Sequence, residues 1–172
     1  TTTQDGSGVD IGKYQGGTIT ADLENGSLDI TSTSGNIVVA SVDVTGSDGT
    51  ADVIITSSGT ITDSTPSDDS SVNITATSVT LQADLGIGAS GLGDIDTTAS
   101  TLLLSTTSSG NIFVADSDAV TLASSSTSSN GNIDVGTVSG DLTVSSAITA
   151  DGSGNITLNS AGALIVNNVL TS

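Results

Sequence analysis

The chain has 172 residues, 19 acidic side chains against one basic side chain, and a formal net charge of −18. Without His or Cys, and with a single Lys, it cannot form disulfides or thiolate metal sites, and it lacks a basic surface for nucleic acid. Anionic membranes repel such a chain, and no apolar run approaches the roughly 20 residues that span a bilayer, so we expect no membrane insertion.

The composition favours a β-structure with an aliphatic interior. Nearly all the acids are Asp, which favours turns, and the apolar residues are Val, Ile, Leu and Ala with one Tyr and one Phe. A compact globule normally uses more aromatic side chains in its core than this, whereas stacked aliphatic rows do not need them. No initiator Met or signal peptide is present, so we expect a mature or excised segment of a longer precursor.

In chain order, residues 1–17 form the least regular part, and we expect an irregular entry segment there. From residue 17 onward, apolar and polar residues alternate in short stretches bounded by Gly, Asn, Ser and Asp, a pattern typical of strands with one buried face. These stretches are 17–21, 26–44, 52–63, 72–84, 100–116, 118–123, 131–135, 140–150 and 162–172.

The alternation recurs at a period that predicts stacked coils. One expected inward row is Leu28, Val53, Val79, Leu102, Val120, Leu142 and Leu164. Its mean step is about 23 residues, within the range of solenoid repeats. We therefore predict one all-β domain over 1–172, a parallel β-helix (β-solenoid) of about seven coils of roughly 22 residues. We expect a right-handed coil because parallel crossovers prefer that hand.

A Gly-Asn-Ile motif recurs at Gly35, Gly110, Gly131 and Gly154. Gly is expected to supply a corner with positive φ, and stacked Asn side chains are expected to form a ladder along the rod. Two other stretches break the coil rhythm. Residues 62–71 contain the only Pro, and 85–96 is rich in Gly, so we expect both to protrude as loops.

The run from Gly131 to Ser172, GNIDV…GDLTVSSAITADGSGNITLNSAGALIV, resembles the filamentous-haemagglutinin-like repeats of large bacterial exoproteins. The resemblance implies a right-handed parallel β-helix used for adhesion and surface display. It also implies a secreted prokaryotic protein located outside the cell or on its surface.

The residue types argue against an enzyme. Ser is abundant, but no His or usable Lys is present to activate it, and Lys13 alone is a poor base for a lyase. A glycoside hydrolase needs two carboxylates, which Asp94/Asp96 or Asp116/Asp118 supply, yet both pairs also fit turns that flank a strand. We expect no enzymatic activity and no required cofactor.

Calcium is the cation that this composition suits best, because it binds carboxylate and carbonyl oxygens. The candidate ligands are Asp48, Asp52, Asp63, Asp68, Asp69, Asp116 and Asp118. The alternative is that these acids are solvated turn residues that keep the rod soluble. Ice binding through Thr-x-Thr rows is a further alternative. The pairs with that spacing are Thr18/Thr20, Thr31/Thr33, Thr60/Thr62 and Thr75/Thr77.

These observations predict a non-enzymatic extracellular structural protein, either a subunit of a surface filament or the shaft of an adhesin. It is expected to polymerise with itself by head-to-tail stacking, because apolar strands lie near both ends and uncapped solenoid ends seek partners. The competing explanation is that these ends are cuts within a longer continuous rod. The expected contact residues are Val9, Ile11, Ile19, Leu164, Val166, Val169 and the lone Phe113. The alternative is an adhesin module that binds host or matrix glycans, or another surface, through its loops.

Overall fold

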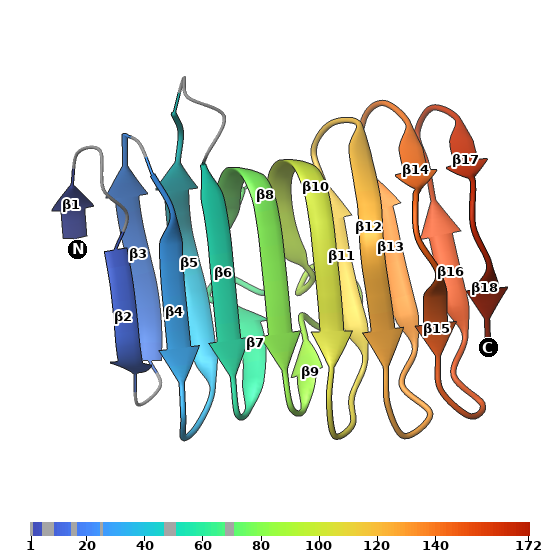
Figure 1. Ribbon diagram of the computed structural model, residues 1–172, viewed down its shortest axis with the longest axis horizontal. Coiled ribbons are helices and arrows are strands. Elements are labelled where there is room, and N and C mark those ends of the chain that lie inside the picture. The colour runs from blue at the N-terminus through green and yellow to red at the C-terminus, as the bar shows by residue number, and fades with distance from the viewer. Residues whose placement is uncertain (1, 5–8, 15–16, 25, 47–50, 68–70) are drawn as a thin grey trace.

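A computed structural model of the chain describes residues 2–4, 9–14, 17–24, 26–46, 51–67 and 71–172, with side chains described from residue 19 onward. The described residues are all β, and their strands pair in parallel and stack in about six turns, which confirms the predicted β-solenoid. Figure 1 shows an elongated stack with the two termini at opposite ends. The right-handed sense stays a prediction.

The strands form two ladders, one on each side of the rod (Figure 1). Two long strands, β8 (Ile74–Ala83) and β10 (Ile95–Thr106), run through both ladders, the rear one first. Besides their later parts, the front ladder consists of β2 (Val9–Tyr14), β4 (Leu28–Ser32), β6 (Asp52–Ser57), β12 (Val120–Thr127), β14 (Leu142–Val144), β15 (Ile148–Ala150), β17 (Leu164–Val166) and β18 (Leu170–Thr171). The rear ladder consists of β1 (Thr2–Gln4), β3 (Gly17–Leu23), β5 (Ile37–Val44), β7 (Thr60–Asp63), the first part of β8 and of β10, β9 (Gly86–Ile87), β11 (Ile112–Asp116), β13 (Ile133–Thr137) and β16 (Ile156–Asn159).

The interior consists of aliphatic side chains stacked in rows, because alternate residues of each parallel strand point inward. The most uniform row is formed by isoleucines of the rear ladder: Ile37, Ile61, Ile87, Ile112, Ile133 and Ile156. All but the last are fully buried, and each buried Ile contributes about 1.5–3 kcal/mol relative to an exposed one. Ser125 interrupts a front row between Leu104 and Ile148, and its buried hydroxyl has no hydrogen-bond partner.

The predicted front row leaves the observed one after Leu102, and its last three members, Val120, Leu142 and Leu164, lie in a neighbouring inward row. Leu102 pairs with Leu122, whereas the sequence pattern predicted Val120 at that place, and Val120 instead pairs with Leu142. The register also shifts between Leu102 and Leu103. Val120 and Leu122 both point inward, so alternation alone does not choose between them, and the length of the preceding turn decides the register.

The Asn ladder is confirmed for three successive coils. The Oδ1 atom of Asn111 accepts hydrogen bonds from the backbone N–H and side-chain amide of Asn132, at 2.8 and 3.1 Å. Asn132 accepts the same two bonds from Asn155, at 2.9 and 3.3 Å. Earlier in the rod, Asn36 accepts a 2.9 Å bond from the backbone N–H of Thr60, although no Asn follows it there. Each bond therefore ties one coil to the next.

The explanation expected for the motif glycines is correct for two of the four. Gly35 and Gly110 have φ values of 94° and 97°, but Gly131 and Gly154 do not have positive φ. At these two positions the backbones of adjacent coils approach closely instead. A Cβ on Gly154 would lie 2.1 Å from the carbonyl oxygen of Gly131, and a Cβ on Gly131 would lie 2.1 Å from that of Gly110.

The three segments expected to be irregular contain more strand than the sequence suggested. The entry segment 1–17 contains β1 and β2. Thr62 and Asp63 belong to β7, and residues 68–70 of the same expected loop lie outside the described residues. In 85–96, Ile87 is buried in the isoleucine row and Ile95 begins β10. Residues 88–94 connect β9 to β10. The residues on either side of this connection, Ile87 and Ile95, pair with Ile112 and Val114 of β11.

Candidate functional site

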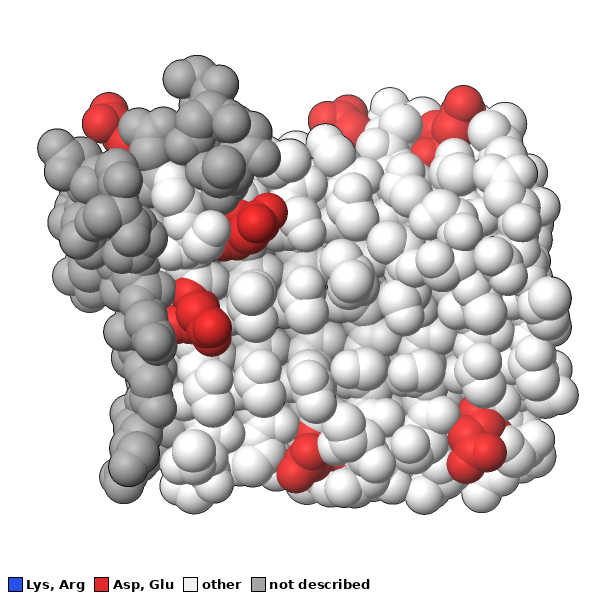
Figure 2. Space-filling model, viewed as in Figure 1, with Lys and Arg blue, Asp and Glu red and all other residues white. Residues whose placement is uncertain are grey.

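The front face of the rod is flat and largely uncharged, despite the acidity of the chain. Figure 2 shows acidic side chains near the N-terminal end of this face and along its upper and lower edges, with neutral residues between them. Among the described side chains of the front strands, the acids are Asp29 and Asp52. The outward residues from β8 onward include Ser78, Thr80, Gln82, Thr101, Leu103, Ser105, Thr121, Ser126, Thr143 and Thr149.

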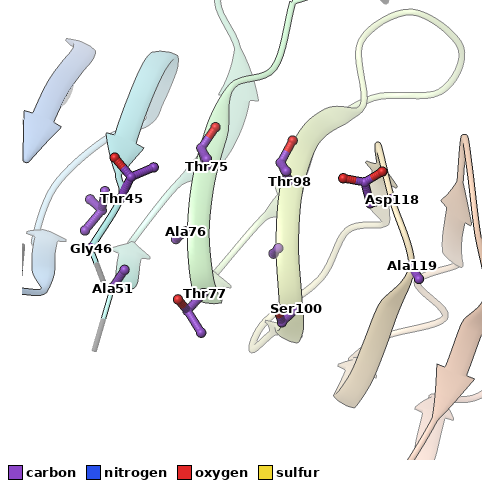
Figure 3. A pocket seen from close by; sticks show the side chains of 12 residues that line it. Thr45, Gly46, Ala51, Thr75, Ala76, Thr77, Thr98, Ser100, Asp118 and Ala119 are labelled. Atoms are coloured by element: carbon purple, nitrogen blue, oxygen red, sulfur yellow. The ribbon is translucent and has the colours of Figure 1, made fainter. Parts of the chain in front are cut away.

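A groove of about 290 Å³ lies where β8 and β10 pass from the rear ladder to the front ladder. These two strands turn the corner without a loop, whereas the chain leaves the ladder at Gly46 and again at Asp118, on either side. Figure 3 shows Thr75, Thr98 and Asp118 one after another on successive coils, with Thr98 between the other two. The Thr98 hydroxyl shares a 2.7 Å hydrogen bond with Ser117.

Asp116 is fully buried next to this groove and fixes its corner. One carboxylate oxygen accepts hydrogen bonds from the Thr97 hydroxyl at 2.7 Å and the Ala99 N–H at 3.0 Å, while the other accepts the Asp118 N–H at 3.0 Å. Burial raises the pKa of Asp116, and the three hydrogen bonds only partly oppose that effect. The carboxylate thus stabilises the turn between β11 and β12.

Asp63 occupies a similar place at the end of β7. Its Oδ1 atom accepts the backbone N–H of Thr65 at 2.9 Å and the side-chain amide of Asn73 at 2.7 Å. The Oδ2 atom is buried without a hydrogen-bond partner. Asn73 in turn accepts the Asp96 N–H at 2.9 Å and donates a 3.4 Å bond to the Val39 carbonyl, so its side chain connects three coils.

The predicted calcium ligands are only partly placed. Asp48, Asp68 and Asp69 lie outside the described residues. Asp52 begins β6, while the carboxylates of Asp63 and Asp116 accept hydrogen bonds within the protein. Within the described ranges, no three acidic side chains gather in a way that could hold a metal ion. Calcium binding therefore stays a prediction.

The threonine pairs that suggested ice binding do not build a continuous row. Thr75 pairs with Thr98, and Thr31 with Thr56. Thr18 pairs with Val38, however, and Thr60 pairs with Gly86. The longer threonine column on the front face, Thr101, Thr121 and Thr143, contains none of the pairs singled out in the sequence.

Phe113 is half-buried on the rear face, beside the Gly88–Asp94 segment. It lines a hollow of about 330 Å³ together with Gly88, Ala89 and Ser90. It also lines a second hollow of about 220 Å³ with Asp94, Asp134 and Asn159 among others. Sequence reasoning singled out Phe113 but missed this set of polar neighbours, because residues on three different coils form it.

The C-terminal end of the rod exposes apolar side chains. Leu164, Val166 and Leu170 are 45, 43 and 42% exposed, although they continue rows that are buried in the preceding coil. Val169 is 63% exposed between them. At the other end, Ile19 is 7% exposed. The backbones of Val9 and Ile11 pair with Leu28 and Ile30, while their side chains lie outside the described part of the chain.

The fold defines the class of this protein as a β-solenoid. No family model matches the chain, and neither a curated protein nor a solved structure matches it. The haemagglutinin-like resemblance thus stays a prediction. Among the described residues, no helix is long and apolar enough to cross a bilayer.

Proposed function

We propose that the protein is a non-enzymatic structural rod of an extracellular filament or adhesin shaft, assembled by head-to-tail stacking of its ends. The observation that supports this most directly is the exposed end formed by β16, β17 and β18. Its apolar residues continue the buried rows in register, so a further coil would cover them as each coil covers the one before.

The first and last residues of each inward row predict which residues would meet at such a junction. In the front ladder, the row that ends at Val166 begins at Val9, and the row that ends at Leu170 begins at Ile11. A second copy that continues both rows places its Val9 beside Val166 and its Ile11 beside Leu170. In the rear ladder, the same continuation places Ile19 of the second copy beside Leu158.

The two ends of the rear ladder are stepped in complementary ways. At one end, β16 pairs with Ile133–Gly136, the first part of the rear strand position. At the other end, β1 pairs with Ala21–Leu23, the last part of that position. Together β16 and β1 of the next copy complete one strand. Because this contact is heterologous and lies along the rod axis, it generates an open filament if the rotation between copies does not close a ring.

The first test is imaging of the purified protein and of Val166→Asp. We expect wild type to form fibres and the variant to remain unassembled, because a charge placed at the junction would lose its hydration among apolar side chains. Thr143→Asp adds the same charge at an outward position, so it should leave fibres unchanged. Fibres of Val166→Asp as long as those of wild type would refute axial stacking through this end.

Disulfide crosslinking tests the register. Because the chain has no native Cys, only the introduced cysteines can form disulfides. Adjacent strands lie about 4.8 Å apart, within the Cα separation of about 4.4–6.8 Å that disulfides span. Oxidation should therefore join Val9→Cys to Val166→Cys in mixed copies. Ile11→Cys with Val166→Cys is displaced by two residues along the strand and should react poorly. Equal yields from the two pairs would contradict the proposed register.

A further inference from the structure

We propose that the hollow of about 220 Å³ beside Phe113 binds an ammonium-bearing sugar unit, such as a deacetylated hexosamine. This inference concerns the rear face of a single rod and does not depend on axial stacking. It rests on how the ladder register assembles an aromatic ring, carboxylates and an amide around a depression.

Small residues create the depression. An outward row of the rear ladder runs from Asp96 through Ala115 and Gly136 to Asn159. The two small residues in its middle leave the surface low, while the larger side chains stand at its ends. Phe113 and Asp134 are adjacent in the neighbouring outward row, and they border the hollow on that side. The Gly88–Asp94 segment closes it with Gly91 and Asp94.

The lining groups favour a ligand that donates hydrogen bonds and has a positive charge. Asp94 and Asp134 contribute carboxylates, and Asn159 contributes an amide whose nitrogen lies 3.5 Å from Asp134. A phenyl face attracts cations, and charge-assisted hydrogen bonds from an ammonium to a carboxylate are the stronger kind. None of the lining residues is basic, so phosphate or carboxylate ligands would be repelled. The net charge of −18 further concentrates cations near the rod.

A sugar fits these features better than a metal ion does. Ca²⁺ prefers six to eight oxygen ligands, whereas an aromatic ring and two glycines form much of this lining. The hollow is slightly below the usual range of about 300–1,000 Å³ for small-molecule pockets, which suits one ring rather than a large ligand. The apolar face of a sugar ring can lie on Phe113 while its hydroxyl and ammonium groups donate to Asp134 and Asn159.

The test is an NMR titration of the intact protein with a glucosamine tetramer. We expect amide shifts centred on Phe113, Asp134 and Gly136. Asp134→Asn should weaken binding about tenfold because it removes a charged acceptor. Asp22→Asn removes the same charge from an exposed position several coils away on the rear ladder, so it should change the affinity less than about twofold. Phe113→Leu and Gly136→Val should also weaken binding, the second by filling the hollow.

Several results would overturn the proposal. Equal losses from Asp134→Asn and Asp22→Asn would show attraction to the acidic rod as a whole. An absence of shifts at millimolar tetramer would show no site. Tetralysine that binds as tightly through the same residues would show a site for ammonium groups in general. The N-acetylated tetramer has no ammonium group, so binding as tight as that of the glucosamine tetramer would remove the charge argument. Circular dichroism of each variant separates lost binding from lost fold.

Discussion

Glycine acts in this rod by letting coils approach as well as by adopting positive φ. Gly154 lacks positive φ, yet a Cβ there would lie 2.1 Å from a backbone oxygen of the preceding coil. Backbone atoms cannot move aside as a flexible side chain can, so any side chain would force the coils apart. Gly136, in β13, has more space around it, since the nearest atom to its Cβ position is 3.4 Å away.

We therefore expect Gly154→Ala to destabilise the fold by more than about 2 kcal/mol, since separating the coils also weakens the hydrogen bonds of Asn155. Gly136→Ala should change the unfolding free energy by less than about 0.5 kcal/mol, as is usual for tolerated surface positions. Denaturant unfolding of both variants measures the difference. Similar midpoints for the two would show that close approach does not explain the motif glycines.

Asp116 gives the rod a specific dependence on pH. Burial raises its folded pKa above the usual value of 3.8, so the folded state binds this proton more tightly than the unfolded state does. The cost of burying the charge is therefore present above the folded pKa and is relieved as the pH falls through it. Repulsion from the Asp118 carboxylate acts in the same direction.

Relative to Asp116→Asn, wild type should gain stability as the pH falls from the folded pKa of Asp116 toward the usual value of 3.8, because only in that interval does the folded state hold this proton while the unfolded state has lost it. The other carboxylates titrate in both proteins, so the difference between the two curves isolates this residue. Thermal unfolding at a series of pH values measures it. A wild-type curve parallel to that of the variant would mean that Asp116 does not titrate in this range.

At the scale of the strand, period-two alternation predicted the inward face correctly for most elements. Leu142 and Val144 are fully buried, and Thr143 between them is only partly so. Alternation says nothing about slips by two residues, however, because these keep the same residues inside. That is why Val120 was assigned to the row of Leu102 in place of Leu122. It also could not recognise Gly86–Ile87 as a strand, since two residues show no period.

The inward assignment of β14 predicts a large contrast between neighbouring residues. Leu142→Asp would place a charge among stacked aliphatic side chains and should cost several kcal/mol. Thr143→Asp, at a partly exposed position, should shift the stability by less than about 0.5 kcal/mol. Differential scanning calorimetry of the two variants measures their thermal shifts relative to wild type. Equal thermal shifts would contradict the observed register of the front ladder.

At the scale of the whole molecule, composition and period predicted an acidic rod but not where its charges lie. The sequence shows Asp beside most turns, and turns of a solenoid gather along its edges. The neutral front face follows from the register, which aligns Ser78, Thr101, Thr121 and Thr143 in one column. The hollow beside Phe113 has the same origin, because its residues become neighbours only when the lengths of successive coils are known.

This distribution predicts how rods associate sideways. At low salt, a net charge of −18 keeps copies apart, and at physiological ionic strength screening acts beyond about 8 Å. Once screened, the parts of two front faces from β8 onward can meet without opposing carboxylates, whereas rear faces bring Asp94 and Asp134 toward those of the partner. Raising the salt concentration should therefore increase lateral association through the front face, and light scattering measures it. Thr121→Glu, in the middle of this face, should suppress the increase.

Thr62→Glu is the matched control for that prediction. It adds the same single charge at an outward position of the rear ladder, where Thr62 pairs with Val38. If the front face mediates the contact, scattering by this variant should rise with salt as it does for wild type. Equal suppression by both variants would instead mean that net charge alone governs association, because both carry the same total charge. A salt response that neither substitution changes would place the contact elsewhere on the rod.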